Sequence, residues 1–383
     1  MRYFSLALEG VALVSQGEIV KGMRRLDEVT AAVGEGRSVS CMSSAPMRSP
    51  NRGLSRRNKG LALLGFLLCP LGLAPQSWKV VIHEWDVPTP KSRPHDPTAA
   101  PDGALWYTGQ LANKLGRLDP KTGTIKEFPL KTPDSGPHGL VADSQGNIWF
   151  TANFKAYIGK LNPRTGEVTE YRMTDERVKD PHSLIFDRDG KVLFTAQQSN
   201  FVGVLDPKSG RVSVQEIPTA KALPYGIILG LDGAGYFCEF GSNKIGKIDP
   251  KTLEITEFPL PEGARPRRLA NNPDRRIYYS DFARGFLGRL DPQTGRAEEW
   301  PSPGGPNSQP YGIASTADGT VWYSEAGVQP NTLVAFDPWS KAFQSWPIPS
   351  GGGVVRNMVA TEDGRLYLAC SGVNKVAIAQ VSH

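Results

Sequence analysis

Short hydrophobic segments alternate with turn sequences along most of this chain. In one stretch, the apolar segments Asn147-Ile-Trp-Phe-Thr151 and Tyr157-Ile-Gly-Lys-Leu161 are bounded by Gln-Gly and Pro-x-Thr-Gly turn signals. Segments of this length, rich in β-branched and aromatic residues, predict strands joined by hairpins. Each unit contains four predicted strands, and the unit recurs about every 43 residues from residue 80 onward.

Two motifs mark the repeat. The turn Asp119-Pro-Lys-Thr-Gly123 has counterparts that begin at Asn162, Asp206, Asp249, Asp291 and, in degenerate form, Asp337. The Trp-Phe-Thr strand has counterparts at residues 105–108, 193–195, 236–238, 278–280, 321–324 and 366–368. Self-similarity at this period with four strands per unit is the signature of propeller blades. Residues 79–383 are therefore predicted to form an all-β, seven-bladed β-propeller.

The two ends of the repeat region predict how the ring closes. Residues 80–87 match an outermost strand, whereas residues 375–379 form a third strand with no fourth after it. The N-terminal strand can therefore complete the last blade and remove its open edge.

The residues before the repeats predict export. An apolar run at 61–73 follows Arg56, Arg57 and Lys59 and is too short for a stable membrane span, so residues 47–77 are predicted to be a secretory signal peptide. A retained membrane anchor is the alternative for this segment. Residues 1–46 have helical apolar spacing, and they are either a helical segment or the result of a start assigned too far upstream. The expected location is periplasmic or secreted.

The charge distribution argues against a nucleic-acid partner, and the positions of the cysteines argue against a disulfide. Residues 1–75 contain ten Lys and Arg against five acids, so about +1 of the net charge of +6 remains for the repeats. A nucleic-acid site needs clustered basic residues, and none is predicted here. Cys238 and Cys370 lie in different repeats and are predicted to be free, buried thiols, because a disulfide needs Cα atoms within about 7 Å.

Polar side chains gather at one end of the predicted channel, where each blade's first strand begins and its second strand ends. The first strands begin with His95, His138, His182, Tyr225, Arg267 with Arg268, Tyr311 and Asn357. The second strands end with Gln110, Asn153, Gln197, Glu239, Asp281, Glu325 and Ser371. Histidines on one wall and carboxylates on the other indicate a site for proton transfer or a metal ion. For a single histidine the alternative is a structural preference for an aromatic ring after proline. For the three acids alone, the favoured interpretation is that they lie on a solvated rim or pair with Arg267 and Arg268.

Four segments resemble the virginiamycin B lyase (streptogramin lyase) family: Pro137-His-Gly139, Gly146-Asn-Ile-Trp-Phe-Thr151, Asn243-Lys-Ile-Gly-Lys247 and Ile255-Thr-Glu-Phe-Pro-Leu260. The likeness extends over all seven repeats. It implies a monomeric, magnesium-dependent carbon–oxygen lyase that acts on a small-molecule substrate. Such enzymes confer antibiotic resistance by opening cyclic depsipeptides through elimination at the ester link.

The resemblance also implies site residues. The family uses histidines from two consecutive Pro-His corners, an acid just before the second, and a glutamate at the end of that blade's second strand. In this chain His182 would be the general base, Asp180 would orient it, and His138 would hold the leaving oxygen or the metal. Gln197 stands at the expected position of the glutamate and cannot carry a charge for a divalent ion.

Further residues of the rim complete the predicted site. The residues expected to contact substrate are His95, Tyr225, Tyr311 and Arg268. The candidate ligands for Mg²⁺, or alternatively Ca²⁺, are Glu239, Asp281 and Glu325. Two other functions stay open: a metal-dependent lactonase that uses those acids, and a non-catalytic exported propeller that binds a ligand. A propeller scaffold hosts many functions, so the fold does not choose among them, and the natural substrate is not predicted.

Overall fold

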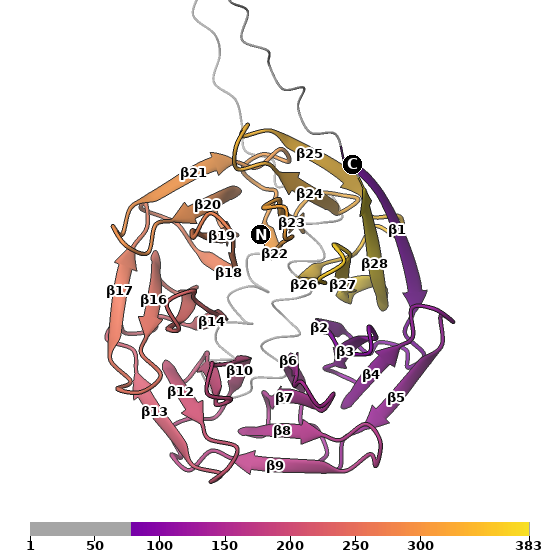
Figure 1. Cartoon of the computed structure of the whole chain (residues 1–383), viewed down its shortest axis with the longest axis vertical. Coiled ribbons are helices and arrows are strands. Elements are labelled where there is room, and N and C mark those ends of the chain that lie inside the picture. The colour runs from indigo at the N-terminus through magenta and orange to yellow at the C-terminus, as the bar shows by residue number, and fades with distance from the viewer. Residues whose placement is uncertain (1–77, 383) are drawn as a thin grey trace, which may run out of the picture.

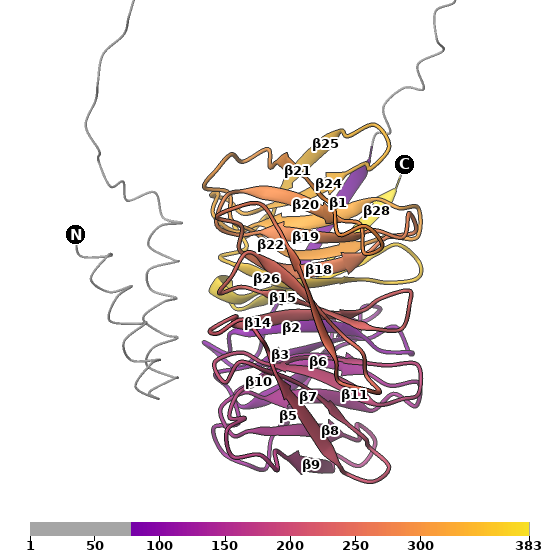
Figure 2. The ribbon, with the colours of Figure 1, turned by 90° about the vertical axis from the view of Figure 1, so that its left-hand side faces the viewer.

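The computed structural model describes residues 78–382 and shows seven four-stranded sheets around a central axis (Figure 1). Seen from the side, the sheets form a flat disc (Figure 2). The predicted seven-bladed β-propeller is therefore confirmed. The interpretations of residues 1–46 and 47–77 lie outside the described residues. Within residues 78–382, no helix has the length and apolar character needed to cross a membrane.

Each of the first six blades consists of four consecutive strands in antiparallel order. Blade one contains β2 (Pro94–Ala99), β3 (Leu105–Gly109), β4 (Lys114–Leu118) and β5 (Ile125–Pro129). Blade two contains β6 (Pro137–Ala142), β7 (Ile148–Ala152), β8 (Tyr157–Leu161) and β9 (Val168–Arg172). Blade three contains β10 (Pro181–Phe186), β11 (Val192–Ala196), β12 (Phe201–Leu205) and β13 (Val212–Glu216).

The same order continues through the other half of the ring. Blade four contains β14 (Pro224–Leu229), β15 (Gly235–Glu239), β16 (Lys244–Ile248) and β17 (Ile255–Pro259). Blade five contains β18 (Pro266–Asn271), β19 (Ile277–Asp281), β20 (Phe286–Leu290) and β21 (Ala297–Pro301). Blade six contains β22 (Pro310–Ser315), β23 (Val321–Glu325), β24 (Thr332–Phe336) and β25 (Phe343–Pro347).

Blade seven joins the two ends of the described chain. Its strands are β26 (Val355–Ala360), β27 (Leu366–Cys370), β28 (Lys375–Ser382) and β1 (Lys79–Asp86), with a short 3₁₀ turn η1 (Ser371–Val373) before β28. β1 pairs with β28 along its full length, from Lys79 opposite Ser382 to Asp86 opposite Lys375. The predicted closure by the N-terminal strand is confirmed, and it covers the edge of β28.

The repeated motifs have structural causes. In blade two, Phe150 lies opposite Gly159, and a Cβ on that glycine would come within 2.1 Å of the Phe150 ring. The Ile-Gly-Lys strand thus leaves room for an aromatic side chain of the Trp-Phe-Thr strand. The hydroxyl that ends this motif links neighbouring blades, because it donates to a carbonyl of the next blade's inner strand from Thr108, Thr151, Thr195, Ser280 and Ser324.

Apolar side chains of adjacent blades pack into buried clusters between the sheets. Two of the buried residues are Cys238 and Cys370, both free thiols, as predicted. Burial raises the pKa of the Cys238 thiol well above its usual range. Both cysteines are therefore packing residues.

Candidate functional site

The start of each inner strand supplies one side chain to a ring across the channel. The strand pairing places Pro94, Pro137, Pro181, Pro224, Pro266, Pro310 and Val355 at equivalent positions. The next residues are His95, His138, His182, Tyr225, Arg267, Tyr311 and Arg356. The prediction of Asn357 for blade seven was one residue too late, because Val355 replaces the proline that marks the strand start elsewhere.

The ends of the second strands also need a correction of register. Glu239, Asp281 and Glu325 lie opposite the strand-starting prolines of blades four to six. In the other blades this position holds Gly109, Ala152, Ala196 and Cys370. The predicted Gln110, Asn153, Gln197 and Ser371 each lie one residue further on. Blade three therefore has Ala196, not Gln197, at the position of the acids, and neither residue supplies a carboxylate.

Three histidine rings and a tyrosine ring form a continuous row across blades one to four. The ring centroids of His95 and His138 are 3.8 Å apart, those of His138 and His182 are 3.7 Å apart, and His182 lies 4.0 Å from Tyr225. The Tyr225 hydroxyl is 2.5 Å from that of Tyr311 on blade six. All five side chains are buried. The structure thus brings together His95, His138, His182, Tyr225 and Tyr311, as the repeat pattern predicted.

Burial favours the neutral form of the three histidines of this row. Burial lowers the pKa of His138 and of His182 well below the usual range, and the positive charge of Arg268 acts in the same direction. His138 donates its Nδ1–H to the backbone carbonyl of His182 at 3.0 Å, which leaves the lone pair on Nε2. The Nε2 atoms of His138 and His182 are both buried without a hydrogen-bond partner in residues 78–382. A buried acceptor of this kind is a candidate general base.

Asp96 and Arg268 form a buried ion pair beside the row. Arg268 Nη2 lies 2.6 Å from Asp96 Oδ1, and the same oxygen accepts a hydrogen bond from His95 Nδ1 at 2.9 Å. Arg268 Nη1 also lies 3.3 Å from the Ser183 hydroxyl. Arg268, predicted to contact substrate, therefore has a protein partner on the opposite side of the ring. Sequence reasoning missed Asp96, although an acid directly after a Pro-His corner was a visible signal.

Arg267 lies among four aromatic rings. Its Cζ atom is 3.9 Å from the Tyr311 ring centroid, 4.1 Å from Phe282, 4.8 Å from Phe240 and 5.1 Å from Tyr225. These distances fall in the range of cation–π contacts. Phe240 follows Glu239 and Phe282 follows Asp281. These phenylalanines were not predicted from the sequence, because the acids were aligned with Gln110 and Asn153.

Each of the three predicted metal ligands accepts hydrogen bonds from nearby residues, although Glu239 Oε1 is buried without a partner in residues 78–382. Glu239 accepts a hydrogen bond from Ser242 Oγ at 2.8 Å, and burial raises its pKa to about 7. Asp281 pairs with Arg284 Nε at 2.6 Å and accepts from the backbone N–H of Arg265. Glu325 accepts from the hydroxyls of Ser302 and Thr332, both at 2.5 Å. These carboxylates are buried and contact loop residues, so neither the solvated rim nor the pairing with Arg267 and Arg268 is found in residues 78–382.

Asp180 has a comparable structural role. Its Oδ1 accepts hydrogen bonds from the backbone N–H and hydroxyl of Ser199 at 3.1 and 2.5 Å, and its Oδ2 accepts from the backbone of Gln198. Burial raises its pKa to about 6. The Nδ1 of His182 instead lies 3.1 Å from the Ser183 hydroxyl. Asp180 is therefore placed to stabilise the turn after β11, and its described hydrogen bonds do not orient His182.

The ring fits a divalent cation poorly. His95, Asp96 and His138 place one ligand atom each within 4.8 Å of one another. However, Asp96 Oδ1 already pairs with Arg268 and His95. Burial, His138 and the positive charge of Arg356 all lower the pKa of His95, so a cation would enter a positive field. Magnesium and calcium prefer several free carboxylate or carbonyl oxygens, which this cluster does not offer.

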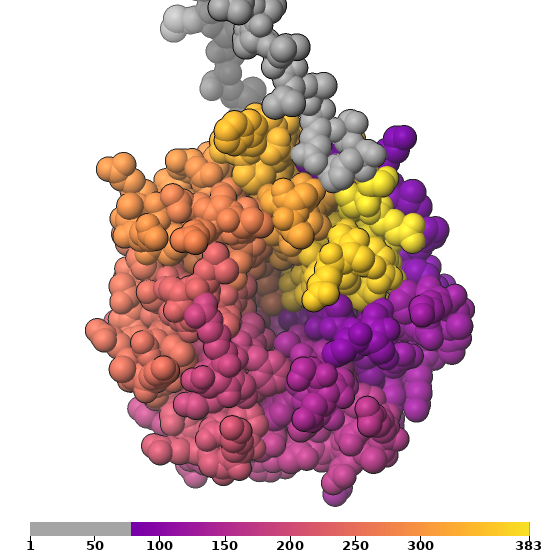
Figure 3. All heavy atoms as spheres, viewed as in Figure 1, coloured from indigo at the N-terminus to yellow at the C-terminus, as the bar shows by residue number. Residues whose placement is uncertain are grey.

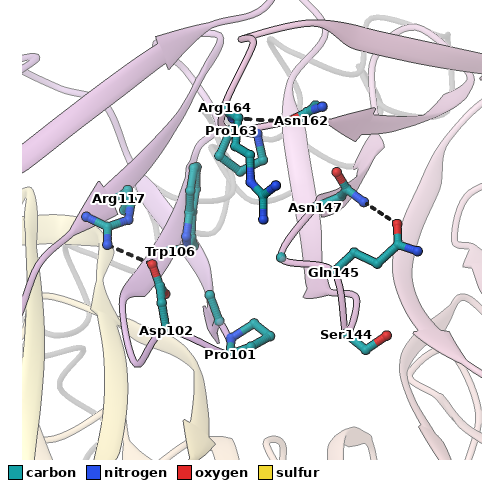
Figure 4. A pocket seen from close by; sticks show the side chains of 12 residues that line it. Pro101, Asp102, Trp106, Arg117, Ser144, Gln145, Asn147, Asn162, Pro163 and Arg164 are labelled. Carbon is teal, nitrogen blue, oxygen red and sulfur yellow. Dashed lines mark hydrogen bonds and ion pairs between the residues drawn. The ribbon is translucent and has the colours of Figure 1, made fainter.

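Two cavities lie away from the histidine row. One of about 340 Å³ occupies the channel beyond Asp96, Ser183 and Arg268 and has mainly aliphatic walls; the disc is hollowed at its centre (Figure 3). The other, of about 740 Å³, lies between the turns of blades one and two. Its polar residues include Asp102 and Arg117, which pair with each other (Figure 4). Neither cavity contains a residue of the histidine row.

Comparison with known proteins agrees with this architecture. A solved streptogramin B lyase is 28% identical, with a TM-score of 0.73 over 79% of this chain and 98% of that chain. Selenomethionine-substituted virginiamycin B lyase from Staphylococcus aureus is 25% identical, with a TM-score of 0.72 over 79% of this chain and 99% of that chain. A catalytically inactive variant of that lyase with quinupristin is 23% identical, with a TM-score of 0.71 over the same shares, a likeness that concerns the fold.

No curated protein matches the chain. The model of the virginiamycin B lyase family matches residues 76–326, which is more than half of the chain. The seven blades and the motifs of the repeat agree with that match. The chain therefore belongs to the virginiamycin B lyase family.

Proposed function

We propose that this chain is a carbon–oxygen lyase of the streptogramin lyase type, which opens a cyclic ester by elimination with a channel histidine as the base. The observation that carries the proposal is His138, an imidazole whose Nδ1–H is donated to the His182 carbonyl and whose buried Nε2 has no hydrogen-bond partner in residues 78–382. His182 contributes a second neutral imidazole at 3.7 Å. The reaction class is inferred from family membership, and the proposed base is a histidine of the row across blades one to three.

The reaction balances without an added reagent. His138 Nε2 takes the proton from a carbon next to a carbonyl group, and the electrons of that C–H bond form a carbon–carbon double bond. The neighbouring carbon–oxygen bond of the ester breaks, and the acid portion leaves as a carboxylate. Burial lowers the pKa of His138 well below its usual range, which favours the neutral form that can accept a proton. No step is assigned to a metal ion, because the described ring does not fit one.

A non-catalytic ligand-binding propeller is the second candidate. It is favoured by the distribution of side chains, because the Pro-His corners lie on blades one to three and the acids lie on blades four to six. No described blade joins a histidine corner to a carboxylate at the end of its second strand. The lactonase alternative has less support, since Asp281 and Glu325 are occupied by loop contacts and only the Oε1 atom of Glu239 lacks a hydrogen-bond partner among these three carboxylates in residues 78–382. We also propose export, on the pattern of residues 47–77.

The test is a product assay by mass spectrometry on purified protein. The substrates are a streptogramin B-type cyclic depsipeptide and a panel of lactones, each with a chelator and with added magnesium. Elimination gives a ring-opened product of unchanged mass, whereas hydrolysis adds one water. We expect the isomeric product with the chelator present, its loss in His138→Gln, and no change in His83→Gln, a control on the exposed face of β1. A hydrated product would reject the lyase proposal, and no turnover of any substrate would favour the binding protein.

A further inference from the structure

Arg267 has a positive charge without an acidic partner in residues 78–382. The other arginine of its strand, Arg268, pairs with Asp96 at 2.6 Å. The three acids at the neighbouring strand ends are bound to Ser242, to Arg284, and to Ser302 with Thr332. The Nε atom of Arg267 is buried and has no hydrogen-bond partner in the described part of the chain. The side chain is partly exposed at the channel, so a ligand from solvent can reach it.

The four aromatic rings hold this guanidinium without using its hydrogen-bond donors. The rings of Tyr311, Phe282, Phe240 and Tyr225 surround Arg267 Cζ at 3.9 to 5.1 Å. Cation–π contacts satisfy the charge through the ring faces. The five N–H donors of a guanidinium lie in its plane and form a fork that matches a carboxylate. A preorganised fork of this kind loses less side-chain entropy when an anion binds.

The surroundings of Arg267 are positive. Burial alone would raise the pKa of Tyr311, but Arg267, Arg356 and Arg268 outweigh it, and the pKa is lowered. The same arginine pair, Arg268 and Arg267, acts with burial to lower the pKa of His182. The positive charges of Arg267, Arg268 and Arg356 therefore attract an anion that approaches Arg267. The neutral histidines do not repel it.

We propose that Arg267 binds a carboxylate group of the ligand at the end of the channel where the inner strands begin, beside Tyr225 and Tyr311. The inference deepens the proposed function and rests on it for its catalytic meaning. Elimination from an ester releases a carboxylate, and Arg267 stabilises this leaving group as the carbon–oxygen bond breaks. Binding itself does not depend on turnover, because the fork and the aromatic rings are present in the folded chain.

Calorimetric titration of the full chain tests the binding. The probe is phenylacetate, which combines a carboxylate with an aromatic ring, and its neutral analogue is phenylacetamide. We expect saturable binding of phenylacetate and at least ~10-fold weaker binding of phenylacetamide, since charge-assisted bidentate pairs are about twice as strong as neutral ones. Arg267→Gln is expected to lose ~10-fold or more in affinity for phenylacetate. Arg296→Gln, an exposed arginine of the same blade, removes the same charge and should leave the affinity within about twofold.

Two further variants keep the test decisive. Arg267→Lys retains the charge and loses the planar fork, so its affinity should lie between those of the wild type and Arg267→Gln; thermal unfolding reports whether each variant is folded. His138→Gln should lose turnover and keep phenylacetate binding. Equal binding of the two probes, no saturable binding by the wild type, or an unaffected folded Arg267→Gln would each overturn this inference. Phenylacetate binding without lyase turnover would reject the proposed function alone.

Discussion

His138 donates its Nδ1–H to the backbone carbonyl of His182, 3.0 Å away on the next blade. The same oxygen accepts the Thr151 hydroxyl at 2.7 Å, so one carbonyl joins the channel row to the second strand of blade two. Gly139 permits this approach, because a Cβ there would lie 2.6 Å from the His182 oxygen. The Pro-His-Gly and Trp-Phe-Thr motifs thus act together to position an imidazole whose buried Nε2 has no hydrogen-bond partner in residues 78–382.

The buried histidines should make the protein sensitive to acid. The folded-state pKa values of His95, His138 and His182 are all lowered, so below pH ~6.5 the unfolded chain binds protons that the folded chain does not. Stability should therefore fall with decreasing pH by up to about 1.4 kcal/mol per pH unit for each histidine. Urea unfolding of His138→Gln between pH 7 and 5 should show a slope shallower by one such contribution. His83 lies on the outer strand β1 and is the control. If His83→Gln made the slope of stability against pH equally shallow, burial of the channel histidines would not be the cause.

Glu239 should have the opposite pH dependence. Its pKa is raised from 4.5 to about 7 by burial, so its stabilising contribution is complete below pH ~4.5 and is lost as pH rises through 7. Glu239→Gln should match the wild type at pH 4.5 and be more stable by about 1–3 kcal/mol at pH 8. Chemical denaturation at the two pH values measures this difference. The exposed Glu254→Gln of the same blade is the matched control, and an equal gain there would refute the assignment.

The Asp96–Arg268 pair should show strong coupling. The two side chains are 172 residues apart in the chain, 2.6 Å apart in space, and buried. Removal of one partner leaves an uncompensated buried charge, so Asp96→Ala and Arg268→Met should each cost about 3–5 kcal/mol. The double variant should recover much of that loss. Additive losses in a double-mutant cycle would mean that the pair does not interact in solution.

Ring closure predicts a large effect for a short deletion. β1 supplies the outer edge of blade seven through eight residue pairs with β28. A chain that starts at residue 88 would expose the edge of β28 and should aggregate or lose cooperative unfolding. A chain that starts at residue 78 keeps the strand and is the control. Size-exclusion chromatography and circular dichroism compare the two, and an equally stable monomer from the shorter chain would contradict the closure.

The fold was predictable because its signals are local and repeated. Each blade carries its own turn residues and alternating strands, and seven copies agree on one arrangement. Closure was predictable because an unpaired first strand and a missing last strand complement each other. The exact register of the residues at the channel rim was not predictable. The pairing shifts between the first and fourth residue of each inner strand, and blade seven starts with Val355 instead of proline.

The site was predictable only in part for a related reason. The repeat correctly placed His95, His138 and His182 at equivalent positions, and the structure stacks them. Contacts across the channel depend on the length and direction of side chains from distant blades, which a repeat does not encode. Three contacts were not predictable for this reason: the pairing of Arg268 with Asp96, the aromatic rings around Arg267, and the loop contacts of Asp180.

His138 is expected to be neutral and to carry its proton on Nδ1. Long-range ¹H–¹⁵N NMR spectra of the histidine rings, assigned with His138→Gln, test it most directly. We predict a protonated Nδ1 and an unprotonated Nε2 for His138 at pH 7, unchanged down to pH 6, because burial keeps its pKa well below 6.5. An imidazolium at pH 7, or a proton on Nε2, would contradict the account.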